Sequence, residues 1–140
     1  MKELTVEERA FLLEGTRTGK LATVRKDGRP HVAPIWFTLD GDTLIFTTGE
    51  NTVKAKNMRR DVRVCLCVDD ETPPFAYIQV EGTVTFSEDR EELLKWATRI
   101  GCRYMGEALA EAYGRRNGVP GELLVRLSPT RVIFEKEIAN

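Results

Sequence analysis

The chain has 140 residues, of which 41% are hydrophobic and 31% charged, and its formal net charge is −1; this size and composition are those of one globular domain, residues 1–140, with a core of its own. The nearly neutral charge argues against nucleic-acid binding, which needs a basic face, and no apolar run approaches the roughly 18 residues that a membrane span requires. The acidic, amphipathic start "MKELTVEERAFLLEG" is unlike a secretory signal, so we expect a cytoplasmic protein with neither a nucleic-acid nor a membrane partner.

The first part of the chain is predicted to be a helix followed by strands. Thr5 and Glu8 form a capping box ahead of the apolar residues 11–13. Strand-like runs separated by turn sequences come next: residues 20–25, 30–39 and 43–48. The Asp27-Gly28 pair is typical of a type I′ hairpin. We expect these three strands to form a meander.

The second part alternates between helices and strands. A short helix is expected to begin at Asn51 or Thr52, and a helical region after Ser87 is followed by a second helical piece that stops at Asn117-Gly118. The remaining strand-like runs are residues 62–69, 76–86, 122–127 and 130–137, the last two joined by a turn at 128–129. The fold class we predict is mainly β, a small β-barrel of six or seven mostly antiparallel strands with flanking helices.

Few side chains of the usual catalytic or metal-binding kinds are present. Cys65 and Cys67 lie two apart in a strand-like run and share a face, and we expect reduced core thiols. One Cys-x-Cys pair, a distant Cys102 and the single His31 lack the spacing of a zinc site, so no metal is expected. Gly-rich phosphate fingerprints and a nucleophile elbow are also missing. No catalytic residue can be named, and a bound cofactor would carry any reaction.

The stretch "TGENTVKAKNMRRD", residues 48–61, points to an anion site. Lys54 would lie in the first turn of the expected helix, where a cation opposes the helix dipole at a cost of a few tenths to about 1 kcal/mol. A phosphate beside it would attract it by about 4 kcal/mol at 4 Å with an effective dielectric near 20. Helix N–H groups and the hydroxyls of Thr47, Thr48 and Thr52 would add donors. The alternative is a solvated basic helix face, which we expect of the two arginines that follow.

Two stretches of the sequence resemble a known protein family: residues 17 to about 86, and more weakly "ELLVRLSPTRVIF" near the end of the chain. The segment "GKLATVRKDGRPHVAPIWFTLDGDTLIFTTGENTVKAKNMRRDVRVCLCVDD", followed by "YIQVEGTV", is similar to the pyridoxamine 5′-phosphate oxidase-like, FMN-binding split-barrel flavoproteins. Within them it is most similar to the deazaflavin (coenzyme F-420)-dependent oxidoreductases. The ordered set that carries the resemblance is the "DGRPH" hairpin, the Thr-Thr pair, Lys54 with Asn57 and Arg60-Asp61, and then "VEG".

The resemblance implies a homodimer with two cofactor sites at the subunit interface. The segment 33–36 would line the tricyclic ring, the Thr-Thr pair would lie under the ribityl and phosphate portion, and Tyr77 would approach from the second subunit. The residues that the resemblance assigns to cofactor binding are Ala33, Pro34, Ile35, Trp36, Thr47, Thr48, Thr52, Val53, Lys54, Asn57 and Tyr77.

Two departures from the family pattern bear on the ligand. Where the phosphate-oxidase branch has an Arg-Lys pair, this chain has Val53-Lys54, and a single lysine suits the singly charged phosphodiester of F-420 better than the doubly charged monoester of FMN. The "RLSP" sequence at 126–129 precedes the final strand and is interpreted as a turn, and the substrate segment of that branch is missing. Pyridoxamine phosphate oxidation is therefore not expected.

The predicted function is that of an F-420-dependent oxidoreductase, which transfers a hydride between reduced deazaflavin and a small or planar unsaturated substrate. The alternatives are an FMN-binding reductase of the same fold and a non-catalytic carrier of deazaflavin or flavin.

For some residues the sequence allows two interpretations. Of Trp36 and Phe37, one should be core and the other near the site or dimer interface. His31 is structural or orients substrate, and Arg115 and Arg116 are exposed helix-end charges or meet the carboxylate tail of the cofactor.

Overall fold

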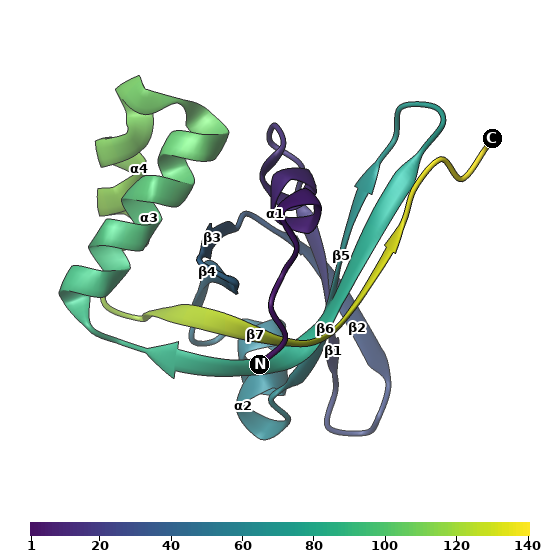
Figure 1. Cartoon of the computed structure of the whole chain (residues 1–140). Coiled ribbons are helices and arrows are strands. Elements are labelled where there is room, and N and C mark those ends of the chain that lie inside the picture. The colour runs from purple at the N-terminus through teal and green to yellow at the C-terminus, as the bar shows by residue number, and fades with distance from the viewer.

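The structure, a computed structural model, describes residues 1–140 and contains one antiparallel seven-stranded sheet with helices packed outside it (Figure 1). The strands are β1 Gly19–Val24, β2 Pro30–Ile35, β3 Thr38–Asp40, β4 Thr43–Gly49, β5 Arg63–Asp70, β6 Ala76–Ser87 and β7 Glu122–Glu135. The helices are α1 Val6–Leu13, α2 Val53–Arg60, α3 Arg90–Met105, the 3-10 turn η1 Glu107–Leu109 and α4 Ala110–Asn117. The predicted mainly β fold class is confirmed. No helix has both the length and the apolar character to cross a bilayer.

The sheet curls into a barrel because its two edge strands are neighbours in the chain. The strand order is β2-β1-β5-β6-β7-β4-β3, so β2 and β3 lie at opposite ends of the sheet. Only Trp36 and Phe37 separate them, and the Cα atoms of Ile35 and Thr38 are therefore at most about 10 Å apart. The meander predicted for residues 20–48 is correct in its two antiparallel pairings, β1 with β2 and β3 with β4, but wrong in its middle strand, because the run 30–39 is divided between the two edges of the sheet.

Two further local predictions are wrong in detail. A type I′ turn needs positive φ at both central residues, but in the β1–β2 loop only Gly28 has it, at 90°, and its N–H donates to the carbonyl of Arg25. Residues 128–129 are not a turn between two strands. They lie inside the continuous β7, where Gly82 pairs with Pro129 and Glu81 with Arg131, a register shift that bends the long strand pair.

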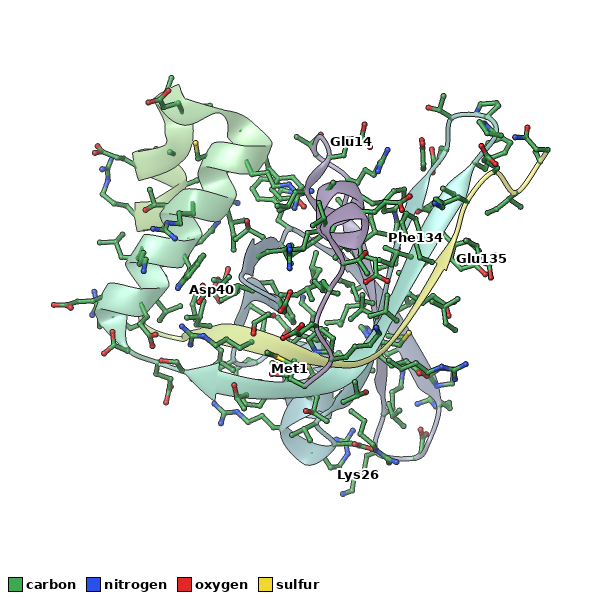
Figure 2. The ribbon with its side chains drawn as sticks, in the orientation of Figure 1. Met1, Glu14, Lys26, Asp40, Phe134 and Glu135 are labelled. Carbon is green, nitrogen blue, oxygen red and sulfur yellow. The ribbon has the colours of Figure 1, made fainter.

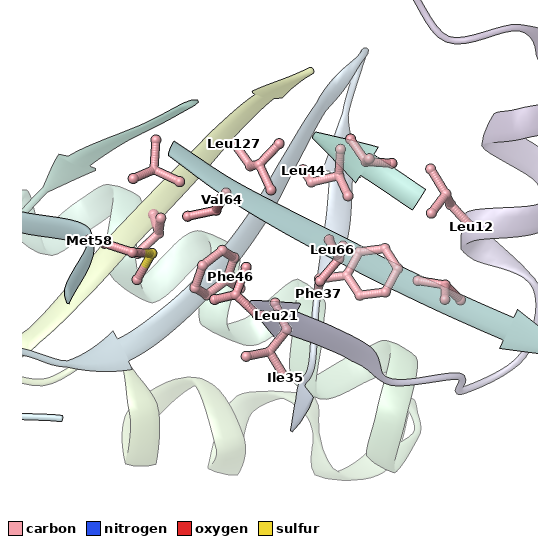
Figure 3. Packing of buried hydrophobic residues seen from close by; sticks show 14 of the residues in the cluster. Leu12, Leu21, Ile35, Phe37, Leu44, Phe46, Met58, Val64, Leu66 and Leu127 are labelled. Atoms are coloured by element: carbon pink, nitrogen blue, oxygen red, sulfur yellow. The ribbon is translucent and has the colours of Figure 1, made fainter. Parts of the chain in front are cut away.

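The barrel interior is filled by alternate residues of the strands (Figure 3). Phe37, Phe46 and Leu66 are fully buried and belong to one core cluster of 18 residues. On β5, Val64, Leu66 and Val68 face this core, and the intervening cysteines face outward and are half-buried. The prediction of core thiols at 65 and 67 is therefore wrong, because the period-2 alternation of the strand gives the interior to its aliphatic residues.

The N-terminal helix covers one open end of the barrel. Its predicted capping box is confirmed: the Glu8 N–H donates to the Thr5 hydroxyl at 3.0 Å, and the Thr5 N–H donates to the Glu8 carboxylate at 2.8 Å. Phe11 packs on Phe134 with ring centroids 5.0 Å apart. Phe134 lies on the α1 side of β7, and Glu135 points away from it (Figure 2).

Helices α3 and α4 pack together on the outside of the barrel, away from the β5–β6 hairpin (Figure 1). Leu93 and Trp96 of α3 form a small buried cluster with Ile45 of β4 and Leu124 of β7. Arg103 ties α3 to the barrel, because its guanidinium donates to the carbonyls of Phe37 at 2.6 Å, Leu12 at 2.8 Å and Gly15 at 3.1 Å. The helix pair is thus held beside the junction of β2 and β3.

Candidate cofactor site

A pocket of about 510 Å³ lies where the end of β2, the β4–α2 junction and the helices α3 and α4 meet. This volume is typical of small-molecule sites. Seven of the eleven residues assigned from the sequence to cofactor binding line it: Pro34, Ile35, Trp36, Thr47, Thr48, Thr52 and Lys54. The structure therefore brings together the segment expected to contact the ring, at the end of β2, and the segment expected to bind the anion, at the β4–α2 junction.

One end of the pocket is the start of α2. The Thr52 hydroxyl accepts from the Ala55 N–H at 3.2 Å, donates to the Gly49 carbonyl at 3.0 Å and lies 3.0 Å from the Thr48 hydroxyl. Thr52 is thus the N-cap, and its hydroxyl is used within the protein. The N–H groups of the first helical turn that have no intrahelical partner remain available to an anion.

Lys54 is the cation at this end of the pocket. It is half-buried in the first turn of α2, and no acidic residue occupies that turn to offset the helix dipole. Its ammonium group makes neither an ion pair nor a side-chain hydrogen bond in the protein. A cation held without a partner at a helix N-terminus provides both components of an anion site, the dipole and a full charge.

The other end of the pocket is aromatic. Trp36 stacks on Tyr104 with ring centroids 5.0 Å apart and an interplanar angle of 3°, and it meets Tyr113 at 5.9 Å. Tyr104 is fixed in turn, because its hydroxyl accepts from the Phe37 N–H at 3.3 Å and donates to the Arg17 carbonyl at 2.8 Å. Phe37 is fully buried, so it is the core residue of the two, and Trp36 lines the pocket; its contact with a ligand stays a prediction.

The helical segment between β6 and β7 also contributes to the pocket. Ile100 of α3 and Arg116 and Asn117 of α4 line it. The Arg116 guanidinium lies 5.4 Å from the ring centroid of Tyr113, whereas Arg115 lies 3.8 Å from Glu111 on the exposed face of α4. Of the two arginines, only Arg116 lines the pocket, and its contact with the carboxylate tail of a cofactor stays a prediction.

Four assigned residues lie elsewhere. Ala33 is on β2, paired with Leu21 of β1, next to the pocket-lining segment. Val53 and Asn57 line a separate basic hollow beside the β1–β2 loop. Asn57 is buried and donates to the Thr23 hydroxyl at 3.0 Å, which ties α2 to β1. Tyr77 lies near the start of β6, opposite Asp69 and Glu135, and does not line the pocket of its own chain.

Sequence reasoning missed Glu122, the only carboxylate in the pocket. It pairs with Gly49 at the β4–β7 end of the sheet, and burial raises the pKa of its carboxyl while Lys54 acts in the opposite direction. No local signal distinguishes this glutamate from the many surface ones. Its position follows from the pairing of two strands far apart in the chain.

The barrel and its pocket define a class of protein. No group of three His, Cys, Asp or Glu side chains is placed to hold a metal ion, and the pocket lies between the start of α2 and an aromatic wall. A split barrel with such a pocket is a fold that binds flavin-type cofactors. The model of the pyridoxamine 5′-phosphate oxidase family matches residues 4–136, and the chain belongs to that family, which includes oxidoreductases.

Solved structures agree with this assignment. The conserved hypothetical protein Rv2991 from Mycobacterium tuberculosis is 24% identical, with 98% of this chain and 91% of that chain covered and a TM-score of 0.82. A protein named F420 reductase is 28% identical, with 89% and 94% covered and a TM-score of 0.70. HutZ, the heme storage protein from Vibrio cholerae, is 19% identical, with 96% of each chain covered and a TM-score of 0.74. The fold is thus shared by proteins with different functions.

Proposed function

We propose that this protein is an F-420-dependent oxidoreductase that transfers a hydride between reduced deazaflavin and a small or planar unsaturated substrate. The observation that carries the proposal is the single pocket that joins an unpaired lysine at a helix N-terminus to the segment Pro34–Trp36. Family membership supports a cofactor of flavin type, and the similarity to a protein named F420 reductase favours the deazaflavin.

The residues present fit an elongated cofactor with a ring at one end and a phosphate at the other. Lys54 and the first-turn N–H groups of α2 would hold the phosphodiester, Thr47 and Thr48 would lie along the ribityl chain, and the segment Pro34–Trp36 would lie against the ring. When bound in its reduced form, the deazaflavin supplies a hydride to an electron-poor double bond. The pocket residues orient the ring and exclude water from one face of it.

No side chain of this chain is placed as a general acid at the ring end. The titratable side chains that line the pocket are Lys54, Arg116 and Glu122, and Glu122 lies beside Gly49 at the anion end. The proton that completes reduction of the double bond would therefore come from solvent.

We further propose a homodimer in which Tyr77 completes the site of the other subunit, because this half-exposed tyrosine lies away from its own pocket.

An FMN-dependent reductase is the second candidate, because the segment Pro34–Trp36 would accept either tricyclic ring. The deciding experiment is a titration of the purified protein with coenzyme F-420 and with FMN, followed by ligand fluorescence. We expect F-420 to bind in the micromolar range or tighter and FMN to bind more weakly. Submicromolar FMN binding without F-420 binding would reverse the cofactor assignment, and binding of neither would refute the proposal.

A turnover assay distinguishes an oxidoreductase from a non-catalytic carrier. We expect the protein with reduced F-420 to oxidise the cofactor when electron-poor alkenes or quinones are added, measured by the return of deazaflavin absorbance and fluorescence. Tight cofactor binding without turnover across such a panel would favour the carrier.

Light scattering measures the mass of the protein in solution, and a monomer that binds the cofactor fully would contradict the proposed role of Tyr77.

A further inference from the structure

A carboxylate lies at the end of the pocket that is otherwise built for an anion. Glu122 opens β7 and lines the pocket together with Lys54 and Arg116. It is half-buried, and its side chain makes no hydrogen bond and no ion pair with the protein. Burial disfavours its charged form, and the one charge that offsets this is Lys54, with which it forms no direct ion pair.

The geometry of the sheet places this carboxylate in the pocket. Glu122 pairs with Gly49 across β4 and β7. Glu122 Oε2 lies 3.2 Å from the point where a Cβ on Gly49 would be, so the absence of a side chain on Gly49 leaves the space that the carboxylate uses. Gly49 is also where β4 ends, shortly before the helix start that offers its N–H groups.

The charges around the anion end are few. Lys54 of α2 and Glu122 of β7 line the pocket there, and Glu50 is an exposed residue of the adjoining turn that does not line it. Arg116 of α4 also lines the pocket, with its guanidinium 5.4 Å from the ring centroid of Tyr113, beside the aromatic wall. Burial raises the pKa of Glu122 and Lys54 lowers it in part. With Glu122 ionised, the side chains that line the pocket carry two positive charges and one negative charge.

We propose that Glu122 is a specificity-determining residue: as a carboxylate it admits a singly charged phosphodiester and disfavours a doubly charged phosphomonoester. The proposal rests on the proposed cofactor function and goes beyond it, because it assigns the choice between F-420-type and FMN-type phosphates to a residue outside the helix start. A second negative charge on the ligand meets the Glu122 carboxylate and finds no cation beside it other than Lys54, because the Arg116 guanidinium lies over Tyr113 at the aromatic wall. The phosphodiester lacks that second charge.

The test compares Glu122→Gln with the wild type, using F-420, FMN and riboflavin as probes. Riboflavin has the ring and ribityl chain of FMN without the phosphate, so it reports on the rest of the pocket. We expect Glu122→Gln to tighten FMN binding by about 10-fold, to tighten F-420 binding by less, and to leave riboflavin binding within about twofold. Glu50→Gln, which removes the same charge from the adjoining turn, should leave the FMN to F-420 ratio of dissociation constants unchanged.

The pH dependence gives an independent readout. The second proton of a phosphomonoester leaves at a pKa of about 6, and Glu122 loses its proton above the ordinary range of a glutamate because burial raises its pKa. FMN binding to the wild type should therefore weaken as the pH rises from 5 to 8. The decrease should be lost in Glu122→Gln, where the second phosphate charge meets only Lys54 and the start of α2, and Glu122→Asp, which keeps the charge, should retain it.

The outcomes are distinguishable. If F-420 binds the wild type but Glu122→Gln leaves the FMN to F-420 ratio unchanged, this inference is wrong and the proposed function stands. An equal shift in Glu50→Gln would show a general charge effect and would also overturn the inference. If none of the three ligands binds the wild type or the variants, both proposals fail. Thermal unfolding of each variant establishes that the binding differences come from folded protein.

Discussion

Replacing Lys54 by alanine tests the anion site, because binding and stability should respond differently. Lys54 is half-buried and its ammonium group has no partner in the protein, so its contact with a phosphate should be a charge-assisted hydrogen bond at the weak end of the range, about 1.5 kcal/mol. We therefore expect Lys54→Ala to raise the dissociation constant of F-420 on the order of 10-fold.

The same substitution should leave the fold intact. Removing a cation from the first turn of α2 relieves an unfavourable dipole interaction of about 0.3–1 kcal/mol, and alanine is a slightly better helix former. The loss of the attraction between Lys54 and Glu122, a half-buried pair that forms no direct ion pair, offsets part of this gain. The free energy of unfolding should change by no more than about 0.5 kcal/mol, with an increase favoured.

The assay is a fluorescence titration paired with urea unfolding. Lys56→Ala is the matched control, because Lys56 lies on the same helix, is exposed and lines the basic hollow beside the β1–β2 loop rather than the pocket. An unchanged dissociation constant in Lys54→Ala, or an equal weakening in Lys56→Ala, would refute the assignment. A loss of binding accompanied by more than about 1 kcal/mol of destabilisation would indicate a structural role for Lys54.

The remaining predictions concern the helix pair and the thiols. A Cβ on Gly114 of α4 would overlap Thr98 Oγ1 and lie 3.0 Å from Thr98 Cβ. Gly114→Ala should therefore lower the free energy of unfolding by about 1–2 kcal/mol after the gain in helix propensity, and adding Thr98→Ala should restore part of this loss. Unchanged thermal unfolding of Gly114→Ala would contradict this packing. Cys102 is exposed, whereas burial raises the pKa values of the Cys65 and Cys67 thiols. Reaction with a thiol reagent at pH 7.5 should therefore show one fast phase from Cys102, which Cys102→Ala abolishes, and slow phases from the other two cysteines, which accelerate as the pH rises. Three equal rates would show that the outer face of β5 is open to the reagent.

Features that depend on neighbouring residues could be read from the sequence alone. The Thr5–Glu8 capping box was predicted where the structure has it, and the helix predicted to start at Asn51 or Thr52 has Thr52 as its N-cap. Such caps can be predicted because they are formed by residues three apart in the chain. The division of roles between Trp36 and Phe37 follows from the alternation of side chains along extended chain. The position of Lys54 at the anion end of the pocket follows from the same local signals.

The contacts between segments that are far apart in the chain depend on the tertiary structure and could not be read from the sequence. The sequence alone gave no sign that Trp36-Phe37 would link the two edges of the sheet, so the run 30–39 looked like one strand of a meander. The same holds for Glu122, which enters the pocket only because β7 pairs with β4, and for Arg116, which the packing of α4 on α3 carries there. Caps and alternation are determined by energies within a few residues, whereas strand pairing and helix placement are selected by the burial of a shared core, to which every segment contributes at once.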